Sequence, residues 1–416
     1  MIRIELPKKV EAIIDKLETN GYEAFAVGGC VRDSVMGREP NDWDITTSAK
    51  PAQIKELFPR TVDTGIQHGT VTVLMGKEGF EVTTYRIDGE YEDHRHPREV
   101  EFTTKLREDL CRRDFTINAM AYSPREGIVD LFGGIHDMKQ RLIRCVGNPS
   151  ERFEEDALRM MRAVRFSGQL GFAIHEDTRK AMEGRADNLR DISVERIREE
   201  LILLLISPNP WKLFAAQELG ITAVILPEFD QLGERADHAV AGIDRLRNLY
   251  PERDKEFSIL CFAMLLHEMK EPRKILRRYK FDNYTVDTAL ALIKYLDYPY
   301  IASPAGVRRA VNEIGAGLMD LLFIFQKAHI LVERQGAPDC LGEISHIQEI
   351  YEGILERGEC TDLKGLAVNG SDLIQAGVKP GVQMGAMLKA LLEIVLDEPE
   401  KNQKVVLLSY VKENKI

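Results

Sequence analysis

Two carboxylates separated by one residue, Asp42 and Asp44, have the residue type and spacing to hold a divalent cation. We place both on a strand, where residues two apart point to the same face and their carboxylates converge. Their oxygens suit Mg²⁺, a hard cation that usually keeps substrate phosphates among its ligands. Metal ions held there would activate a hydroxyl nucleophile and stabilise leaving pyrophosphate, the chemistry of nucleotidyl transfer. Asp42 and Asp44 are therefore the predicted catalytic and metal-binding residues.

A phosphate-binding turn is predicted shortly before this pair. The apolar residues 24–27 predict a buried strand, and residues 31–36 predict a short helix. Gly28 and Gly29 then lie at a strand-to-helix turn, where the backbone can approach a ligand closely and a helix N-terminus can meet an anion. Arg32, inside this helix, adds a positive charge.

Each of these pieces occurs often by chance, since Gly-Gly turns are common and an acidic chain contains many Asp-x-Asp pairs. In this order, on a strand, a turn, a helix and a second strand, they resemble the Gly-Gly…Asp-x-Asp signature of the nucleotidyltransferase superfamily that includes DNA polymerase β. The resemblance covers the first ~50 residues and does not indicate a substrate. Glu81, on a strand predicted over residues 80–86, is a candidate third carboxylate facing Asp42 and Asp44.

A second polar constellation follows at residues 110–120, where two arginines precede a predicted apolar helix. Arg112 and Arg113 are candidates for contacts to a triphosphate. Asp114 and Asn118, four apart on one helix face, are candidates for holding a ribose. The alternative is a charged helix start with Asp114 as its N-cap. The long polar stretch 88–104 before it is typical of a loop that is either functional or disordered.

After residues 147–149 the sequence becomes almost purely helical, beginning with one helix predicted from 150 to about 167. On it Asp156 and Arg159 are neighbours one turn apart. A carboxylate accepts from the exocyclic amine of cytosine or adenine, and Arg donates to the adjacent ring nitrogen or carbonyl oxygen. Such a pair selects C and A over U and G. The alternative is a surface salt bridge, the commoner fate of such residues.

Together these segments resemble the ordered motifs of class II tRNA nucleotidyltransferases, the family of CCA-adding enzymes and bacterial poly(A) polymerases, over residues 24 to about 200. The matching motifs are Gly28-Gly29-x-x-Arg32-Asp33, Asp42-x-Asp44, Arg112-Arg113-Asp114-Phe115-x-x-Asn118-Ala119, Asp130-x-x-Gly133-Gly134-x-x-Asp137 and Glu155-Asp156-x-x-Arg159.

The resemblance implies an α/β catalytic head of the DNA polymerase β-like type, followed by an all-α neck, body and tail. We place these parts at residues 1–147, 148–208, 209–335 and 336–416. It also implies Mg²⁺ at Asp42 and Asp44, base reading by Asp156 and Arg159, and a role for the loop 88–104 in changing the pocket from CTP to ATP. The nucleotide-binding residues expected are Gly28, Gly29, Arg32, Arg113, Asp114, Asn118, Asp156, Arg159 and Arg162.

The implied reaction is template-independent addition of the 3′-terminal CCA to tRNA from CTP and ATP. Within the family an A-adding enzyme or a poly(A) polymerase would use the same site. The loop 88–104 favours complete CCA addition, and the lack of a long basic extension after Leu408 argues against the polymerase. A small-molecule nucleotidyltransferase and an inactive RNA-binding module are more remote alternatives, disfavoured by the helical arm and by the intact Asp-x-Asp pair respectively.

Two segments of the helical arm are candidates for contacts to the tRNA acceptor arm. The basic cluster consists of Arg273, Lys274, Arg277 and Arg278 and, by default, is a solvated helix face. A strip that contacts tRNA phosphates is the alternative. In the tail, Gly381 and Gly385 are expected at a helix N-terminus, where they either meet phosphate or allow close helix packing.

The composition fits an intracellular enzyme. The 416 residues carry a net charge of −11, so a nucleic acid must be held by local basic strips rather than by the overall field. Six scattered cysteines without a Cys-x-x-Cys pair argue against a disulfide framework and a zinc site. No signal-peptide pattern opens the chain and no apolar run approaches ~20 residues, so we expect a cytoplasmic protein without a membrane partner.

Overall fold

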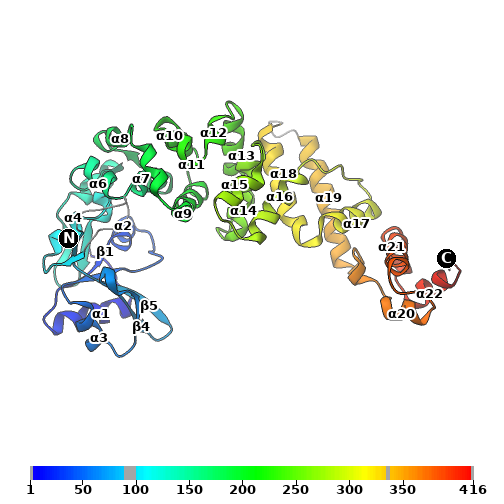
Figure 1. Ribbon diagram of the computed structural model, residues 1–416, viewed down its shortest axis with the longest axis horizontal. Coiled ribbons are helices and arrows are strands. Elements are labelled where there is room, and N and C mark those ends of the chain that lie inside the picture. The colour runs from blue at the N-terminus through cyan, green and yellow to red at the C-terminus, as the bar shows by residue number, and fades with distance from the viewer. Residues whose placement is uncertain (1–2, 89–99, 334–337, 414–416) are drawn as a thin grey trace. The chain divides into compact units, whose positions relative to one another are not determined.

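The computed structural model describes residues 3–88, 100–333 and 338–413 (Figure 1). The chain forms two compact units, Met1–Gln231 and Leu232–Ile416. The first unit is built on a sheet and the second is made of helices, so the predicted α/β head followed by an all-α region is confirmed.

A seven-stranded sheet forms the centre of the first unit. Its strands are β1 (Ala24–Val27), β2 (Ile45–Thr47), β3 (Thr61–Gly65), β4 (Thr70–Met75), β5 (Glu78–Thr84), β8 (Met120–Ser123) and β9 (Gly127–Asp130). They are ordered β3-β4-β5-β2-β1-β8-β9, with β2 and β5 parallel and the other neighbours antiparallel. The strands predicted over residues 24–27 and 80–86 are confirmed to within two residues.

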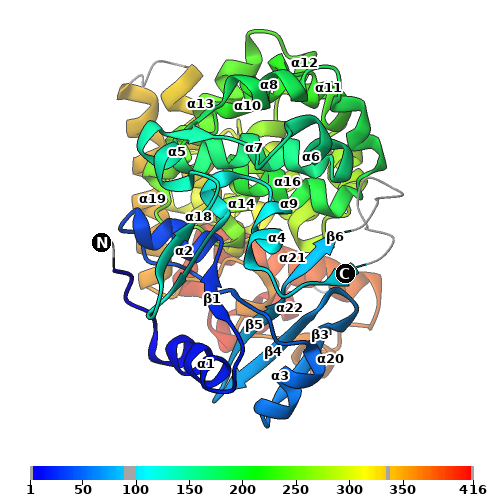
Figure 2. The ribbon, with the colours of Figure 1, turned by 90° about the vertical axis from the view of Figure 1, so that its left-hand side faces the viewer.

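Helices cover both faces of this sheet. α1 (Lys8–Thr19) and α3 (Pro51–Leu57) pack on one face (Figure 2). α1 buries Val10, Ile13, Ile14 and Leu17, an apolar stripe with the spacing of one helix face. Phe25 and Val27 are two residues apart on β1, so their side chains point to the same face of the sheet. There they pack with Leu110 of α4 (Leu106–Cys111).

The strand pairing brings the predicted site residues together beside three inner strands of the sheet, β1, β2 and β5. β1 and β2 are antiparallel with Ala26 opposite Ile45, so Asp44 lies opposite Val27, whose amide donates to the Asp44 carbonyl, and Gly28 follows directly. β5 runs parallel to β2 with Val82 opposite Ile45, which puts Glu81 level with Asp44. This convergence depends on the register of strands distant in sequence.

Two predicted helices are wrong. Residues 110–120 are not a helix, because α4 ends at Cys111 and a short 3-10 turn, η2 (Thr116–Asn118), leads into β8. The predicted helix from 150 to about 167 is two helices, α6 (Pro149–Glu155) and α7 (Leu158–Leu170). At Asp156 the backbone is extended, with φ −144° and ψ 101°, and the Asp156 carboxylate accepts from the amide of Leu158. Aspartate favours such an end position because its carboxylate competes for backbone amides.

The rest of the first unit is short strands and helices. A short strand, β10 (Leu142–Ile143), pairs in parallel with β11 (Ala173–Ile174). The two ends of the predicted loop 88–104 pair as β6 (Arg86–Asp88) and β7 (Val100–Phe102); its residues 89–99 lie outside the described residues. The remaining elements are α2 (Gly29–Val35), η1 (Ile66–His68), α5 (Gly134–Gln140), α8 (Glu176–Met182), η3 (Ala186–Asp191), α9 (Val194–Leu205), α10 (Lys212–Glu218), α11 (Ile221–Ile225) and α12 (Pro227–Asp230).

The second unit is helical throughout. Its helices are α13 (Arg235–Leu249), α14 (Lys255–Leu266), α15 (Pro272–Arg278), α16 (Asn283–Lys294), α17 (Pro304–Ile314), α18 (Ala316–Glu333), α19 (Pro338–Glu356), α20 (Gly370–Gln375), α21 (Val382–Asp397) and α22 (Lys404–Glu413), with 3-10 turns η4 (Leu363–Gly365) and η5 (Pro399–Lys401). α19 packs on α17 and α18 through Ile347, Tyr351 and Ile354.

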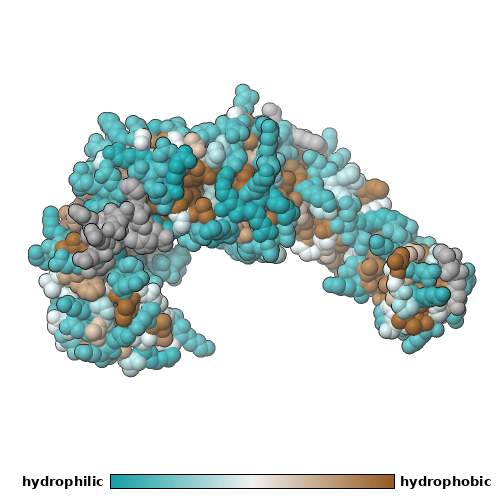
Figure 3. Space-filling model, in the orientation of Figure 1, coloured by the Kyte–Doolittle hydropathy of each residue, from teal (hydrophilic) through white to brown (hydrophobic). Residues whose placement is uncertain are grey.

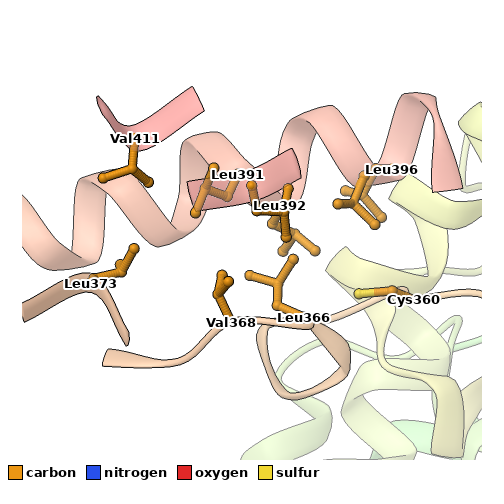
Figure 4. Close-up of a cluster of buried hydrophobic side chains, with 10 residues drawn as sticks. Cys360, Leu366, Val368, Leu373, Leu391, Leu392, Leu396 and Val411 are labelled. Atoms are coloured by element: carbon orange, nitrogen blue, oxygen red, sulfur yellow. The ribbon is translucent and has the colours of Figure 1, made fainter. Parts of the chain in front are cut away.

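The last helices enclose a small core of their own (Figure 4). Leu391 and Leu392 of α21 face Leu366 and Val368 of the preceding segment, and Val411 of α22 closes one end. The two units expose mainly hydrophilic side chains on the face seen in Figure 3. Within the described ranges, no single helix has the length and apolarity to cross a membrane. Only taken together do α17 and α18, which meet at an angle of 104°, reach that length and apolarity.

One buried arginine joins α17 to the end of α21. Arg308 donates to the carbonyls of Leu396 (2.6 Å) and Asp397 (3.1 Å) and pairs with Glu359. We expect Arg308→Leu to lower the unfolding free energy of the second unit by about 3 kcal/mol, because two backbone carbonyls lose their buried donor and the half-buried Glu359 carboxylate keeps only its pair with Arg357. Urea unfolding measures this loss. The adjacent Arg309→Leu is the matched control, since its side chain is 40% exposed and its ion pairs should contribute below about 1 kcal/mol.

Candidate active site

The glycine turn connects β1 to α2, as predicted. Gly28 has φ +84°, a conformation that side chains disfavour, and its amide donates to the carbonyl of Met120. A Cβ at Gly28 would lie 3.1 Å from Nη1 of Arg113, which lies over the turn. Gly29 is the first residue of α2. The turn therefore needs glycine for its backbone and for the close approach of an arginine.

The carboxylate pair lies beside this turn. Asp42 and Asp44 come directly before β2 rather than on a strand, which corrects their predicted placement. Although both side chains are exposed, the surrounding protein desolvates Asp44, and this desolvation, with the negative charges of Asp42 and Glu81, raises its pKa to about 6. The Arg113 guanidinium opposes this shift. Because Asp42, Glu81 and Arg113 all act electrostatically on the Asp44 carboxylate, we infer that these side chains lie near it.

The donor set fits a divalent cation. Among the residues that the structure describes, no group of three or more His, Cys, Asp or Glu side chains has an arrangement that would hold a metal ion. Asp42 and Asp44 nevertheless offer hard oxygen ligands, and a bound cation would offset the desolvation and the neighbouring negative charges that raise the pKa of Asp44. A cation that keeps water or phosphate oxygens in its remaining positions needs only such a pair. Whether Glu81 is a third ligand stays a prediction.

A buried polar network begins at Arg32 of α2. The Arg32 guanidinium donates to Asn118 Oδ1 (2.6 Å) and to both carboxylate oxygens of Asp33. Asn118 in turn donates to Asp114 Oδ1 (3.1 Å). Asp114 is buried, and it also accepts from the amide of Phe115. Three predicted nucleotide-binding residues, Arg32, Asp114 and Asn118, are thus brought together. Asp114 lies in a loop and Asn118 in a 3-10 turn, rather than both on one helix face.

The network continues to α7 and α9 through Arg162. Its Nε and Nη2 donate to Asp114 Oδ2 at 2.8 and 2.6 Å. Arg162 also lies 3.5 Å from Glu200 of α9, which accepts from Arg165 at 2.6 Å. The sequence reasoning missed Glu200 and Arg165. Arg165 lies on α7 and Glu200 on α9, and nothing local in the sequence indicated that these two helices pack together.

The acid dependence of stability should report on Asp114. Burial alone would raise its pKa, but Arg162, Asn118 and the Phe115 amide outweigh burial and lower it from 3.8 to about 2. Because the folded state then binds fewer protons, this contribution of ~2 kcal/mol is present above pH 4 and is lost as the pH falls toward 2. We expect urea unfolding of the wild type and of Asp114→Asn to differ most at pH 7 and to converge below pH 4. A difference independent of pH would contradict the ionised pair.

The predicted base-reading residues do not form a pair with each other. Asp156, in the break between α6 and α7, accepts from Nη1 and Nη2 of Arg196 on α9 at 3.3 and 2.7 Å. Arg159 pairs with Glu155 and donates to the carbonyl of Arg112. The alternative of an Asp156–Arg159 surface salt bridge is therefore wrong. Arg196 is a further residue that the sequence reasoning missed.

The predicted RNA contacts lie in the second unit. The basic cluster, Arg273, Lys274, Arg277 and Arg278, occupies α15, where Arg273 lies 3.6 Å from Asp287 and Lys274 pairs with Glu271. Gly381 directly precedes α21 with φ +109°, and Gly385 lies in the first turn of that helix. The predicted position at a helix N-terminus is confirmed, while the contacts to RNA stay predictions.

Comparison with known families assigns the class. The family described as Poly A polymerase head domain matches residues 24–144, and the tRNA nucleotidyltransferase domain 2 family matches residues 252–411. A third family, the probable RNA and SrmB-binding site of polymerase A, matches residues 171–232. With the sheet and the carboxylate pair beside the glycine turn, these matches define a nucleotidyltransferase of the poly(A) polymerase type.

Similar proteins narrow this class. The CCA-adding enzyme of Lactiplantibacillus plantarum is 38% identical, over 99% of this chain and 98% of the relative. That of Geobacillus kaustophilus is also 38% identical, over 96% and 95%. The crystal structure of the Bacillus stearothermophilus CCA-adding enzyme in complex with CTP superimposes with a TM-score of 0.79 at 33% identity, over 99% of both chains. The chain belongs to the family of CCA-adding enzymes.

Proposed function

We propose that this protein adds the 3′-terminal CCA to tRNA without a template, using CTP and ATP and releasing pyrophosphate. The observation that carries the proposal is the carboxylate pair Asp42 and Asp44, beside the glycine turn in a chain that matches CCA-adding enzymes over nearly its whole length. The four-part division into head, neck, body and tail belongs to the same proposal.

The residues around the glycine turn and the carboxylate pair would position the reacting groups. The triphosphate would lie against Gly28 and Gly29, with Arg113 over the turn. The tRNA 3′-hydroxyl would attack the α-phosphorus in line, and pyrophosphate would leave toward the turn. Mg²⁺, the divalent ion we propose for Asp42 and Asp44, would acidify the hydroxyl and offset the charge of the leaving group when bound. The network through Arg32, Asn118 and Asp114 would fix the floor of the pocket.

The neck would choose the base. Two Arg196 donors hold the Asp156 carboxylate, which leaves lone pairs for an exocyclic amine. Arg159 is held by Glu155 and by the carbonyls of Arg152 and Arg112, and we propose that its guanidinium donates to the adjacent position on the base. The proposed selection of C and A therefore depends on Asp156 and Arg159, whose side chains are held in place by different partners.

The RNA would be held by exposed charge and backbone in the second unit, and we propose the cytoplasm as the site of action. The cluster on α15 and the start of α21 at Gly381 and Gly385 are the proposed contacts to the acceptor arm. The proposed role of the loop 88–104 in the change from CTP to ATP belongs mainly to residues outside the described ranges.

Incubation with tRNA transcripts tests the proposal. Transcripts that end before CCA, after C or after CC are supplied with Mg²⁺ and with CTP, ATP or both, and the mass of each 3′ end is measured. Stepwise growth to CCA followed by a stop is the expected result. Addition of A to the CC transcript alone would indicate an A-adding enzyme, and continued addition of A a poly(A) polymerase. No addition to any transcript would contradict the proposal.

A further inference from the structure

Asp109, on α4, holds a fully buried carboxylate that ties three segments together. Its Oδ1 accepts from Nε and Nη2 of Arg112 at 3.0 and 2.8 Å. Its Oδ2 accepts from Oγ1 of Thr46 on β2 at 3.1 Å and from Nη2 of Arg113 at 3.3 Å. Burial alone would raise the pKa of Asp109, but the two arginines lower it, so the carboxylate is ionised. A buried charge of this kind needs all of its partners.

Arg113 is the partner that faces the candidate active site. Its Nη1 lies over Gly28, at 3.1 Å from the position that a Cβ would take there. Its positive charge acts on Asp44. Among the described residues, its Nε is buried and has no hydrogen-bond partner. An arginine that gives one donor to a buried carboxylate and keeps others unused beside a glycine turn is placed to bind an anion.

Asp109 also fixes where this arginine lies relative to the carboxylate pair. Thr46, which donates to the same oxygen, follows Asp44 by two residues on β2. Arg113 and the strand that leads from Asp44 are therefore held by one atom, Asp109 Oδ2. A free arginine side chain would lose considerable rotamer entropy on binding an anion, and a preformed contact removes much of this cost.

We propose that Asp109 is a positioning residue that holds Arg113 against the glycine turn, where the guanidinium binds the β- and γ-phosphates of the nucleotide and the pyrophosphate product. The inference deepens the proposed function and rests on it. Arg113 acts as the direct phosphate ligand, and Asp109 acts only through Arg113. Their effects on anion binding must then be coupled.

Calorimetric binding of inorganic pyrophosphate with Mg²⁺ tests this coupling, because pyrophosphate has no base and needs no tRNA. We expect Asp109→Asn to weaken pyrophosphate binding about tenfold, the loss typical of a charge-assisted contact. Arg113→Gln should weaken it at least as much, and the double variant no more than Arg113→Gln alone. Losses that multiply in the double variant, or wild-type affinity in Asp109→Asn, would overturn the proposal.

Asp137→Asn is the matched control for lost stability. Asp137 is also a buried carboxylate that accepts from a threonine and an arginine, Thr116 (2.7 Å) and Arg144 (3.0 Å), without contact to Arg113. Its replacement should lower the melting temperature and leave pyrophosphate affinity unchanged. If Asp109→Asn does not fold, Asp109→Glu, which displaces the charge by one methylene, should show the same coupled loss. A wild-type protein that binds pyrophosphate but extends no tRNA would contradict the proposed function and leave this inference standing.

Discussion

Asp44→Asn should reduce nucleotide addition by at least about a thousandfold and leave the unliganded protein as stable as the wild type or slightly more stable. The loss corresponds to about 4 kcal/mol of transition-state stabilisation, a magnitude expected when one ligand of a catalytic cation is removed. The retained stability follows from the raised pKa of Asp44, because desolvation and the negative charges of Asp42 and Glu81 disfavour its ionised form. Single-turnover addition of CMP to tRNA and urea unfolding measure the two quantities.

The pH dependence of stability distinguishes an unfavourable Asp44 charge from a general disruption of the fold. The folded-state pKa of about 6 lies above the ordinary value of 3.8, so the folded protein binds more protons between these values. The stability of the wild type relative to Asp44→Asn should therefore be greatest below pH 4 and fall as the pH rises through 6. Solvent exposure of the side chain keeps this change small.

Two controls complete the test of the carboxylate pair. Asp63→Asn, at an exposed aspartate on β3 that pairs with Lys55, should change neither activity nor stability appreciably. Glu81→Gln should reduce activity about as strongly as Asp44→Asn if Glu81 binds the cation, and less than about tenfold if it only contributes charge. Activity of Asp44→Asn within tenfold of the wild type would contradict the assignment of the metal site.

Asp156→Ala should reduce the preference for CTP and ATP over UTP and GTP by about 10- to 100-fold, the discrimination that one well-placed polar pair supplies. Without the carboxylate, the exocyclic amines of C and A lose their acceptor. Arg196 loses its partner at the same time, and its donors can then meet the O4 carbonyl of uracil. UTP should therefore gain in absolute rate, which a general loss of activity would not produce.

Incorporation rates for the four nucleotides, each on tRNA ending before CCA and after CC, measure this change. Glu154→Ala is the matched control, because Glu154 lies two residues away on α6 with a side chain that is 60% exposed. Asp156→Asn should give an intermediate result, since an amide both accepts and donates. An Asp156→Ala enzyme that still rejects UTP and GTP would assign base reading to other residues.

Local patterns were sufficient to predict the glycine turn. The apolar strand, the glycine pair and the short helix were predictable because each feature is encoded within a few neighbouring residues. Glu81 was a candidate for the same reason, as it follows a strand pattern. Its position level with Asp44, however, depends on the parallel register of β2 and β5, which no local pattern specifies.

The neck could be predicted only in part. The apolar spacing from Phe153 to Val164 continues through the break, so periodicity alone indicated one helix. The break arises because the backbone at Asp156 is extended and its carboxylate is held by Arg196, forty residues further along the chain. Asp109 was missed for a similar reason, since its spacing to Arg112 suggests a local surface pair and hides the contact to Thr46.

The largely buried series of hydrogen-bonded side chains from Arg32 to Arg165 restricts how its members can change during evolution. The members between them are Asn118, Asp114, the half-buried Arg162 and Glu200. Its charges alternate in sign, so each is neutralised by its neighbours. Replacement of one charged member removes at least one ion pair, whereas compensated replacement of two neighbours keeps the charge balance. We expect natural variants to differ at these sites in pairs or not at all.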